Sequence, residues 1–131
     1  MNPPEFENLK RGEELLPISR WQDFLRRFAA ERDWDKFHTP KNLAMALAGE
    51  AGELLEIFQW LTEEESKTIM DDPKQAEKLR HELADILIYL LRLADKLEVA
   101  LEPTIAEKMS HNAAKYPVEK SRGSAKKYTE L

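Results

Sequence analysis

Cysteine is absent from the 131-residue sequence, so neither disulfide bonds nor a thiolate zinc site can contribute to this chain. The lack of cysteine fits a reducing compartment, and we expect a cytoplasmic location. No run reaches the ~18 uncharged apolar residues that a membrane span requires, and the first residues carry no apolar stretch of the signal-peptide kind, which predicts no membrane partner. Basic residues are not in excess either. The net charge of −5 argues against a nucleic acid polymer as ligand but permits a small phosphorylated ligand escorted by magnesium.

Glycine is scarce as well, with four residues, whereas long stretches are rich in Leu, Ala, Glu and Lys, which favours helix over sheet. A hydrophobic fraction of 42% beside a charged fraction of 34% is typical of a soluble globular protein. At this length one domain is expected, small enough to gain from self-association. Both terminal segments are polar and lack periodicity. We therefore predict a flexible segment over 1–17, a helical domain over 18–116, and a tail over 117–131 that docks on a neighbouring subunit.

Helix-start signals recur along the central part of the chain. Capping boxes begin at Ser19 and Thr62, and an N-cap residue followed by proline occurs at Thr39 and Asp72. Tyr116 precedes a proline and should end the last helix, because the residue before proline is disfavoured in helical conformation. The pattern predicts an all-α bundle of four to five helices, over about residues 19–33, 40–61, 62–70, 73–99 and 102–116.

The 40–61 helix carries carboxylates where apolar side chains are expected. On a helical wheel at about 100° per residue, Glu50 lies within about 40° of Leu43 and Ile57, in the middle of the apolar stripe. Glu53 lies about 60° round from Glu50, at the edge of the same stripe. Glu56 lies about 120° round and is expected to face solvent.

The 73–99 helix repeats this arrangement. Glu82 lies within about 40° of Tyr89 and Leu93, and Asp85 lies about 60° away at the edge of the stripe. A bare buried carboxylate costs several kcal/mol. Two helices that pack through these stripes would bring four carboxylates together, and their mutual repulsion would be relieved by cations between them. The two acid pairs therefore predict a divalent metal site.

Carboxylates without sulfur or imidazole form an all-oxygen site, which suits Mg²⁺ or Mn²⁺. Two other interpretations stay open. Glutamates on a helix usually form a solvated face, and a single pair spaced i, i+3 would mean little. A ferritin-like di-iron bundle would need Glu-x-x-His on two helices, a motif that this sequence lacks.

The acid pairs are part of a longer resemblance. Glu-Ala-Gly-Glu at 50–53, followed after 28 residues by Glu-Leu-Ala-Asp at 82–85, resembles the E-x-x-E…E-x-x-D signature of the MazG-like, all-α NTP pyrophosphohydrolases. The segments FAAERDWDKFHTPKNLAMALAGEAGELLEIFQW, ELADILIYLLRLA, KMSHNAAKYP and KKYTEL are similar to the dCTP pyrophosphatase branch of that family. The resemblance covers about residues 19–131.

The resemblance implies an enzyme that uses Mg²⁺ or Mn²⁺ and hydrolyses dCTP, or a related or modified pyrimidine dNTP, between the α and β phosphates to give dNMP and pyrophosphate. It implies Glu50, Glu53, Glu82 and Asp85 as metal ligands. It also implies assembly as a homodimer or as a dimer of dimers, with active sites built across subunits. Glu53, at the edge of its stripe, is the better candidate for a catalytic base. The alternative is a non-catalytic helical oligomer that binds a nucleotide or a partner protein.

Aromatic residues near helix ends are candidates for holding the base. Trp34 and Trp60 lie beside polar loops, where stacking of a base on an indole gains about 1–3 kcal/mol, although tryptophan also commonly fills a seam between helices. The resemblance assigns the family's base pocket to these positions. Tyr89 can hydrogen-bond sugar or phosphate, or simply pack in the core. Lys36 and His38 match a family segment that contacts substrate, whereas their residue types alone indicate surface side chains.

Further candidates lie in the last predicted helix. Lys108, Asn112 and Lys115 fall within about 60° of one another, and three donors on one face suit phosphate oxygens. A solvated basic stripe is the alternative, and it is favoured for Lys115. The resemblance departs at Leu25, where vertebrate-type relatives carry a histidine, so one hydrogen bond of the family's pocket is missing.

Overall fold

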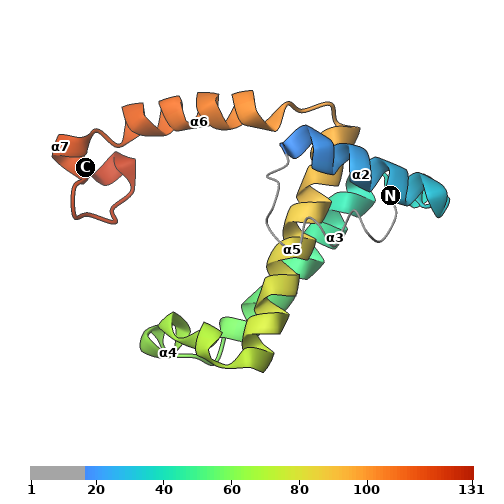
Figure 1. Cartoon of the computed structure of the whole chain (residues 1–131). Helices are drawn as coiled ribbons and strands as arrows, with labels where there is room; N and C mark the ends of the chain where they lie inside the picture. Colours follow the sequence, from blue (N-terminus) through green and yellow to red (C-terminus); the bar gives the residue numbers. More distant parts are fainter. Residues whose placement is uncertain (1–16) are drawn as a thin grey trace. The chain divides into compact units, whose positions relative to one another are not determined.

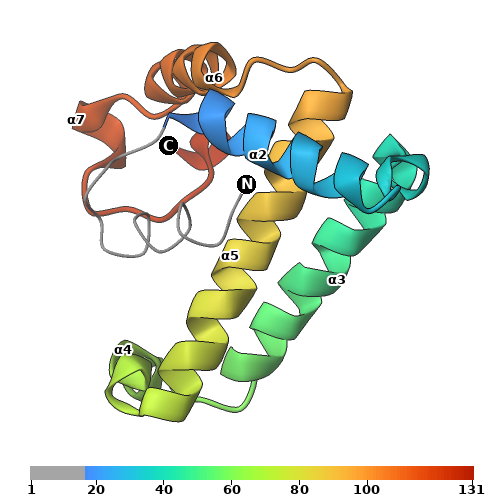
Figure 2. The same cartoon turned by 45° about the vertical axis from the view of Figure 1, so that its right-hand side comes forward.

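The computed structural model describes residues 17–131, which form helices and no strand (Figures 1 and 2). No helix in this range is both long and apolar enough to cross a bilayer. The chain divides into two compact units, residues 1–97 and 98–131. Described elements of the first unit are α2 (Ile18–Glu31), η1 (Asp35–Phe37), α3 (Pro40–Phe58), α4 (Glu63–Lys67), η2 (Ile69–Asp71) and α5 (Pro73–Lys96), where η denotes a 3-10 helix.

Helices α3 and α5 lie side by side and antiparallel in both views (Figures 1 and 2). Each begins at a proline that follows a capping side chain. The Thr39 hydroxyl accepts a hydrogen bond from the Asn42 N–H at 3.3 Å, and one Asp72 carboxylate oxygen accepts from the first free N–H groups of α5. Leu43 and Leu79 are buried on the pair, with 1% and 7% of their surface exposed. The caps and this small core align the acid-bearing stripes of the two helices.

Helix α2 crosses the end of α5 near Leu91, and Ala29 is its buried residue (Figure 2). The chain leaves α2 through a Schellman turn. The Trp34 N–H donates to the Ala29 carbonyl at 2.9 Å, and the Asp33 N–H donates to the Ala30 carbonyl at 3.1 Å. Asp33 occupies the left-handed position of this turn, with φ 53°, a conformation that aspartate tolerates better than most residues. The turn sets the position of Trp34 at the start of η1.

The second unit consists of α6 (Leu101–Lys115), α7 (Val118–Ser121) and η3 (Tyr128–Glu130). The rings of Tyr116 and Tyr128 meet edge to face with centroids 6.0 Å apart. The Lys115 ammonium lies 4.9 Å from the centroid of the Tyr128 ring. The end of the chain therefore folds back onto the C-terminus of α6.

Most predicted helix starts are confirmed. Thr39 and Asp72 cap their helices, and Thr62 forms the predicted capping box with Glu65. The predicted box at Ser19 is wrong, because α2 already begins at Ile18 and Ser19 lies inside its first turn.

The predicted ends need more correction. The long helices end at Phe58 and Lys96, about three residues earlier than predicted, because the chain turns into loops there. The last long helix begins at Leu101, slightly before the predicted start, and ends before Pro117 as expected. The predicted tail contains α7 and η3, so the described chain has six α-helices instead of four to five. The predicted flexible segment 1–17 lies, except for its last residue, outside the described residues.

Candidate functional site

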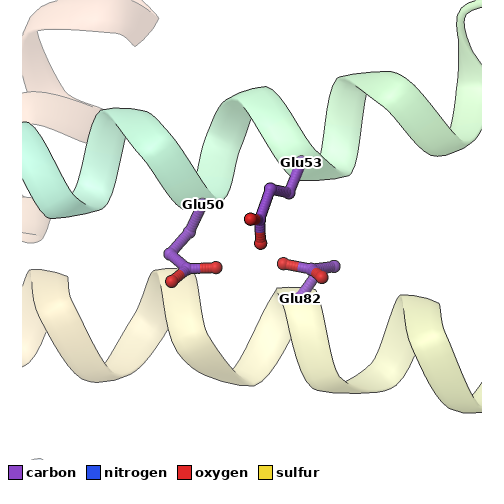
Figure 3. Close-up of side chains that lie close together, drawn as sticks. All are labelled: Glu50, Glu53 and Glu82. Atoms are coloured by element: carbon purple, nitrogen blue, oxygen red, sulfur yellow. The ribbon is translucent and has the colours of Figure 1, made fainter.

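Three carboxylates meet between α3 and α5. Glu50 and Glu53 extend from α3 and Glu82 extends from α5, and one oxygen of each lies within 4.8 Å of the others (Figure 3). Glu50 and Glu82 are half-buried and Glu53 is exposed. This follows the wheel positions, since Glu50 and Glu82 occupy the middle of their stripes and Glu53 occupies an edge. The structure thus brings together three of the four acids that the sequence predicted as metal ligands.

The cluster is not satisfied by the protein itself. Among the described residues, the buried side-chain oxygens without a hydrogen-bond partner are Oε2 of Glu50 and Oε2 of Glu82. Burial, followed by the proximity of Glu53, Glu82 and Asp85, raises the pKa of Glu50 from 4.5 to about 7. Buried polar atoms normally find partners, and a cation between these carboxylates would satisfy both oxygens.

The donor set fits a hard divalent cation. All three groups are carboxylates, and carboxylate oxygens are the ligands preferred by Mg²⁺ and Mn²⁺. A cation would satisfy the orphaned oxygens and remove the repulsion that raises the Glu50 pKa. The cluster can therefore hold a metal ion.

Asp85, the fourth predicted ligand, lies one turn along α5 from Glu82 and is half-buried. Its carboxylate lies outside the three-residue group, but its charge contributes to the raised pKa of Glu50. Asp85 also lines a neighbouring cavity of about 390 Å³ between α2, α5 and η1. It therefore connects the acid cluster to this cavity.

The cavity is mainly aromatic and aliphatic. Three residues predicted to bind substrate, Trp34, His38 and Tyr89, line it together. Leu25 lines it as well. The remaining lining residues all come from α2 and α5: Trp21, Phe24, Phe28, Ala29, Ile88 and Arg92. A flat ring of low polarity suits such a wall, with the few polar groups fixing its orientation.

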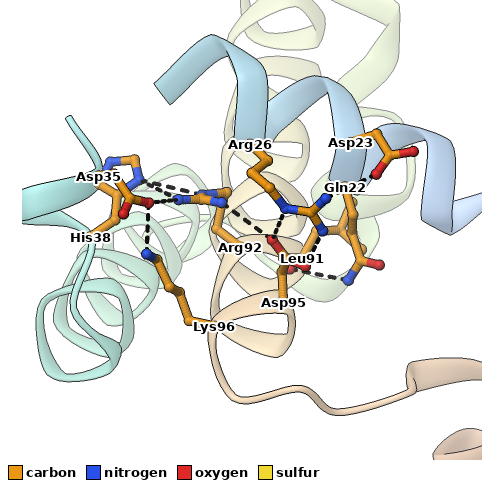
Figure 4. Close-up of polar contacts among 9 residues, drawn as sticks. All are labelled: Gln22, Asp23, Arg26, Asp35, His38, Leu91, Arg92, Asp95 and Lys96. Carbon is orange, nitrogen blue, oxygen red and sulfur yellow. Dashed lines mark hydrogen bonds and ion pairs between the residues drawn. The ribbon is translucent and has the colours of Figure 1, made fainter. Parts of the chain in front are cut away.

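Sequence reasoning missed Arg92. This residue is 2% exposed, and its guanidinium donates to His38 Nδ1 at 3.4 Å, to Asp35 at 3.2 Å and to Asp95 at 3.4 Å (Figure 4). Asp35 also accepts from Lys96 at 2.6 Å, and this contact is the main reason why the pKa of Asp35 is lowered. The signal in the sequence was an arginine interrupting the apolar run of α5.

Other predicted residues lie elsewhere. Trp60 follows the end of α3 and is 86% exposed, whereas Trp34 precedes the start of the same helix. A helix of 19 residues spans about 28 Å, so the two indoles are not neighbours within one chain. Lys36 is exposed and pairs with Asp33. Lys108 and Asn112 belong to α6, in the second unit.

Comparison with known proteins relates the chain to one family. The profile of the MazG-like family matches residues 46–131. The protein dCTP pyrophosphatase 1 of Rattus norvegicus is 51% identical over 104 residues, and that of Homo sapiens is 48% identical over the same length. In each case the match covers 79% of this chain and 61% of the relative. The chain thus spans less than two thirds of the length of these relatives.

A solved structure is similar as well. A pyrophosphatase from Archaeoglobus fulgidus superposes with a TM-score of 0.72 at 39% sequence identity, over 79% of this chain and 95% of that one. The family match over residues 46–131 spans both acid pairs of this chain. The chain belongs to the MazG-like family.

Proposed function

We propose that this protein is a nucleoside triphosphate pyrophosphohydrolase that cleaves dCTP, or a related or modified pyrimidine dNTP, between the α and β phosphates. The observation that carries the proposal is the pair of orphaned oxygens of Glu50 and Glu82 beside an aromatic cavity. The names of the relatives, dCTP pyrophosphatase 1 and a pyrophosphatase, support this substrate class. A metal site next to a base-sized cavity suits a ligand that has both a triphosphate and an aromatic ring.

Glu50, Glu53 and Glu82 would hold the ion, with Asp85 as a fourth ligand, and Mg²⁺ or Mn²⁺ fits their oxygen donors. A bound cation supplies charge neutralisation for the triphosphate and lowers the pKa of water. Water attacks the α-phosphorus, the bond from this atom to the oxygen that bridges to the β phosphate breaks, and pyrophosphate leaves. Glu53 is the exposed member of the cluster and is the group that we assign to accept the proton of the water.

The cavity would hold the base. Trp34 can stack on it, and Tyr89 and His38 can donate hydrogen bonds to the base or sugar. Lys36, Lys108 and Asn112 are proposed donors to the phosphates. Because Trp60 is 86% exposed and lies at the far end of α3 from this cavity, we assign it to the site of a neighbouring copy.

A second copy is also supported by uncovered apolar surface. Leu83, Leu87 and Leu90 form a stripe on α5 and are 52%, 53% and 39% exposed. Ile105 and Met109 on α6 are 55% and 58% exposed. Monomeric proteins rarely leave such stripes in water, so we propose a homodimer or a dimer of dimers. Light scattering should give a mass of two or four chains, and Leu87→Lys should lower it; a monomeric wild type would defeat this assembly.

We assign residues 18–116 to the hydrolase domain and 117–131 to a tail that docks on a neighbouring subunit. A substrate drawn from the free nucleotide pool supports a cytoplasmic location. Removal of residues 117–131 should weaken assembly more than it weakens folding of the first unit. Light scattering and the thermal unfolding of the truncated chain separate these two effects.

The activity is tested by incubating the protein with dCTP and MgCl₂. Cleavage between the α and β phosphates gives dCMP and pyrophosphate, whereas cleavage between the β and γ phosphates gives dCDP and phosphate, so product identification decides the bond. We expect dCMP and pyrophosphate, loss of turnover with EDTA, and loss of turnover in Glu53→Gln. Tight binding of nucleotides without turnover of any common NTP or dNTP would support the non-catalytic alternative.

A further inference from the structure

The imidazole of His38 faces a guanidinium. Arg92 places Nε at 3.4 Å and Nη2 at 3.3 Å from Nδ1 of His38 (Figure 4). A guanidinium has only N–H donors and cannot accept a hydrogen bond. Nδ1 of His38 must therefore be the acceptor, and the ring proton of the neutral imidazole lies on Nε2.

The positive neighbour also keeps the ring neutral. Burial, followed by the charge of Arg92, lowers the pKa of His38. No described residue accepts a hydrogen bond from Nε2, and His38 lines the cavity with Trp34 and Tyr89. The Nε2–H group is thus a donor without a partner among the described residues, on a side chain that lines the cavity.

Arg92 itself has little freedom to move. It is 2% exposed, and it bonds Asp35 on η1 and Asp95 on its own helix. Lys96, which lies on α5 like Arg92, donates to Asp35. Arg26 on α2 forms two hydrogen bonds with Asp95, at 2.6 and 3.1 Å. This ion network ties η1, α2 and α5 together, so His38 is held against a fixed group.

We propose that Arg92 is a positioning residue that holds His38 in the Nε2–H form and thereby gives the cavity a donor that cannot become an acceptor. The inference rests on the proposed function, because it assigns this donor to an acceptor on the nucleobase. A free histidine can exchange its tautomer to serve either a donor or an acceptor. With Nδ1 engaged by Arg92, that exchange is prevented.

The consequence is a rule for base selection. On its Watson–Crick edge cytosine presents the unprotonated ring nitrogen N3, which accepts a hydrogen bond, beside a C2 carbonyl that uracil and thymine share. Uracil and thymine carry an N–H at the equivalent ring nitrogen, so two donors would face each other there. A fixed Nε2–H that meets this ring nitrogen therefore favours cytosine over uracil and thymine, and Arg92 contributes to specificity without touching the base.

The tautomer can be read directly in the wild-type protein. The ring nitrogens of His38 are observed by ¹⁵N NMR and assigned by comparison with His38→Gln, which separates them from His81 and His111. We expect Nδ1 with the shift of an unprotonated nitrogen and Nε2 with that of a protonated one. A proton on Nδ1 in the wild type overturns the inference. This measurement needs no turnover, so it stands apart from failure of the proposed function.

The role of Arg92 is tested by substitution. In Arg92→Met we expect a measurable fraction of His38 with the proton on Nδ1, and in Arg92→Lys we expect restoration of the Nε2–H form by the retained donor. Loss of the arginine should lower the preference for dCTP over dTTP, expressed as the ratio of kcat/KM values, by about tenfold, with most of the change in KM. An Arg92→Met protein that keeps the pure Nε2–H form and the wild-type preference overturns the proposal.

Arg26→Gln is the matched control. It removes the outer ion pair with Asp95 but leaves the contact between Arg92 and His38 intact. Neither the tautomer of His38 nor the preference for dCTP should change. If Arg92→Met does not fold, the wild-type spectrum together with the substrate preference of Arg92→Lys decides the matter.

Discussion

Helix α5 carries two charged side chains whose surroundings differ. Glu82, in its middle, is half-buried and has an oxygen without a partner. Arg92, near its C-terminus, is 2% exposed and donates to three different side chains. The same helix thus contains one charge that the protein satisfies and one that it leaves unsatisfied.

The difference indicates two kinds of role. A buried charge costs several kcal/mol unless partners surround it. The partners of Arg92 all come from the chain itself, so its charge stabilises and positions the structure around the cavity. One oxygen of Glu82 has no partner among the described residues, so part of its cost is offset only when something else binds. An unsatisfied charge therefore points to a binding site, whereas a satisfied one points to support for the site.

The largest effect is expected when the unsatisfied charge is removed. Glu82→Gln should lower kcat/KM for dCTP by at least about 100-fold, because disturbing only the groups around a metal ligand already costs 10–100-fold. Steady-state kinetics measure this loss. Glu56→Gln is the matched control, since Glu56 lies on α3 near the cluster but is exposed and outside the three-acid group. Equal kcat/KM values for the two variants would contradict the binding role that we infer from the unsatisfied charge of Glu82.

Removal of the satisfied charge, that of Arg92, should have its main effect on the free energy of unfolding. Arg92→Met is expected to lower the free energy of unfolding by about 2–4 kcal/mol, because Asp35 and Asp95 lose a buried partner. Glu82→Gln in metal-free buffer should be neutral or stabilising, since it relieves repulsion in the cluster. Denaturant unfolding of both variants in EDTA measures the two changes in unfolding free energy. Destabilisation by both to the same degree would mean that Glu82 has a partner within the protein.

Protonation of Glu50 provides a smaller test. Its pKa is raised from 4.5 to about 7, so between these pH values the folded protein holds a proton that the unfolded chain has released. Metal-free protein should therefore be most stable at the acidic end of this window. Its free energy of unfolding should fall by on the order of 2 kcal/mol as pH rises through 7. Glu50→Gln should flatten the dependence, and so should added Mg²⁺. Thermal unfolding between pH 5 and 8 measures it, and a flat wild-type profile would contradict the account.

The smallest effect is expected at the outer edge of the arginine network. Arg26 is about half exposed, so its pair with Asp95 is screened by solvent. Arg26→Gln should cost no more than about 1 kcal/mol of unfolding free energy and should leave the activity unchanged. A loss as large as that of Arg92→Met would show that the network acts as one unit and not as a buried centre with an exposed rim.

The acid cluster was predictable from the sequence because it depends on helical periodicity. Glu50 and Glu82 interrupt apolar stripes, and two long, well-capped helices that pack through these stripes must bring them together. Arg92 was not predictable in this way. Its partners His38 and Asp35 lie more than 50 residues away in a loop, and only the crossing of α2, η1 and α5 makes them neighbours.

The tryptophans show the same limit. Both Trp34 and Trp60 were predicted at helix ends, and both lie there. The sequence could not tell that only Trp34 lines the cavity. Local signals predicted the elements and their caps, whereas the sharing of one pocket by separated residues depends on tertiary packing or on a second copy.

The most direct test of the central claim is calorimetric titration of metal-free protein with Mn²⁺ in buffers of different ionisation enthalpy. This method counts the protons released when the ion binds. At pH 6 the raised pKa of Glu50 keeps most of its carboxyl groups protonated, so we expect release of nearly one proton per site, falling toward none above pH 8. Binding should be lost in Glu82→Gln. Absence of binding, or binding with the same proton release at every pH, would contradict the claim that these carboxylates await a cation.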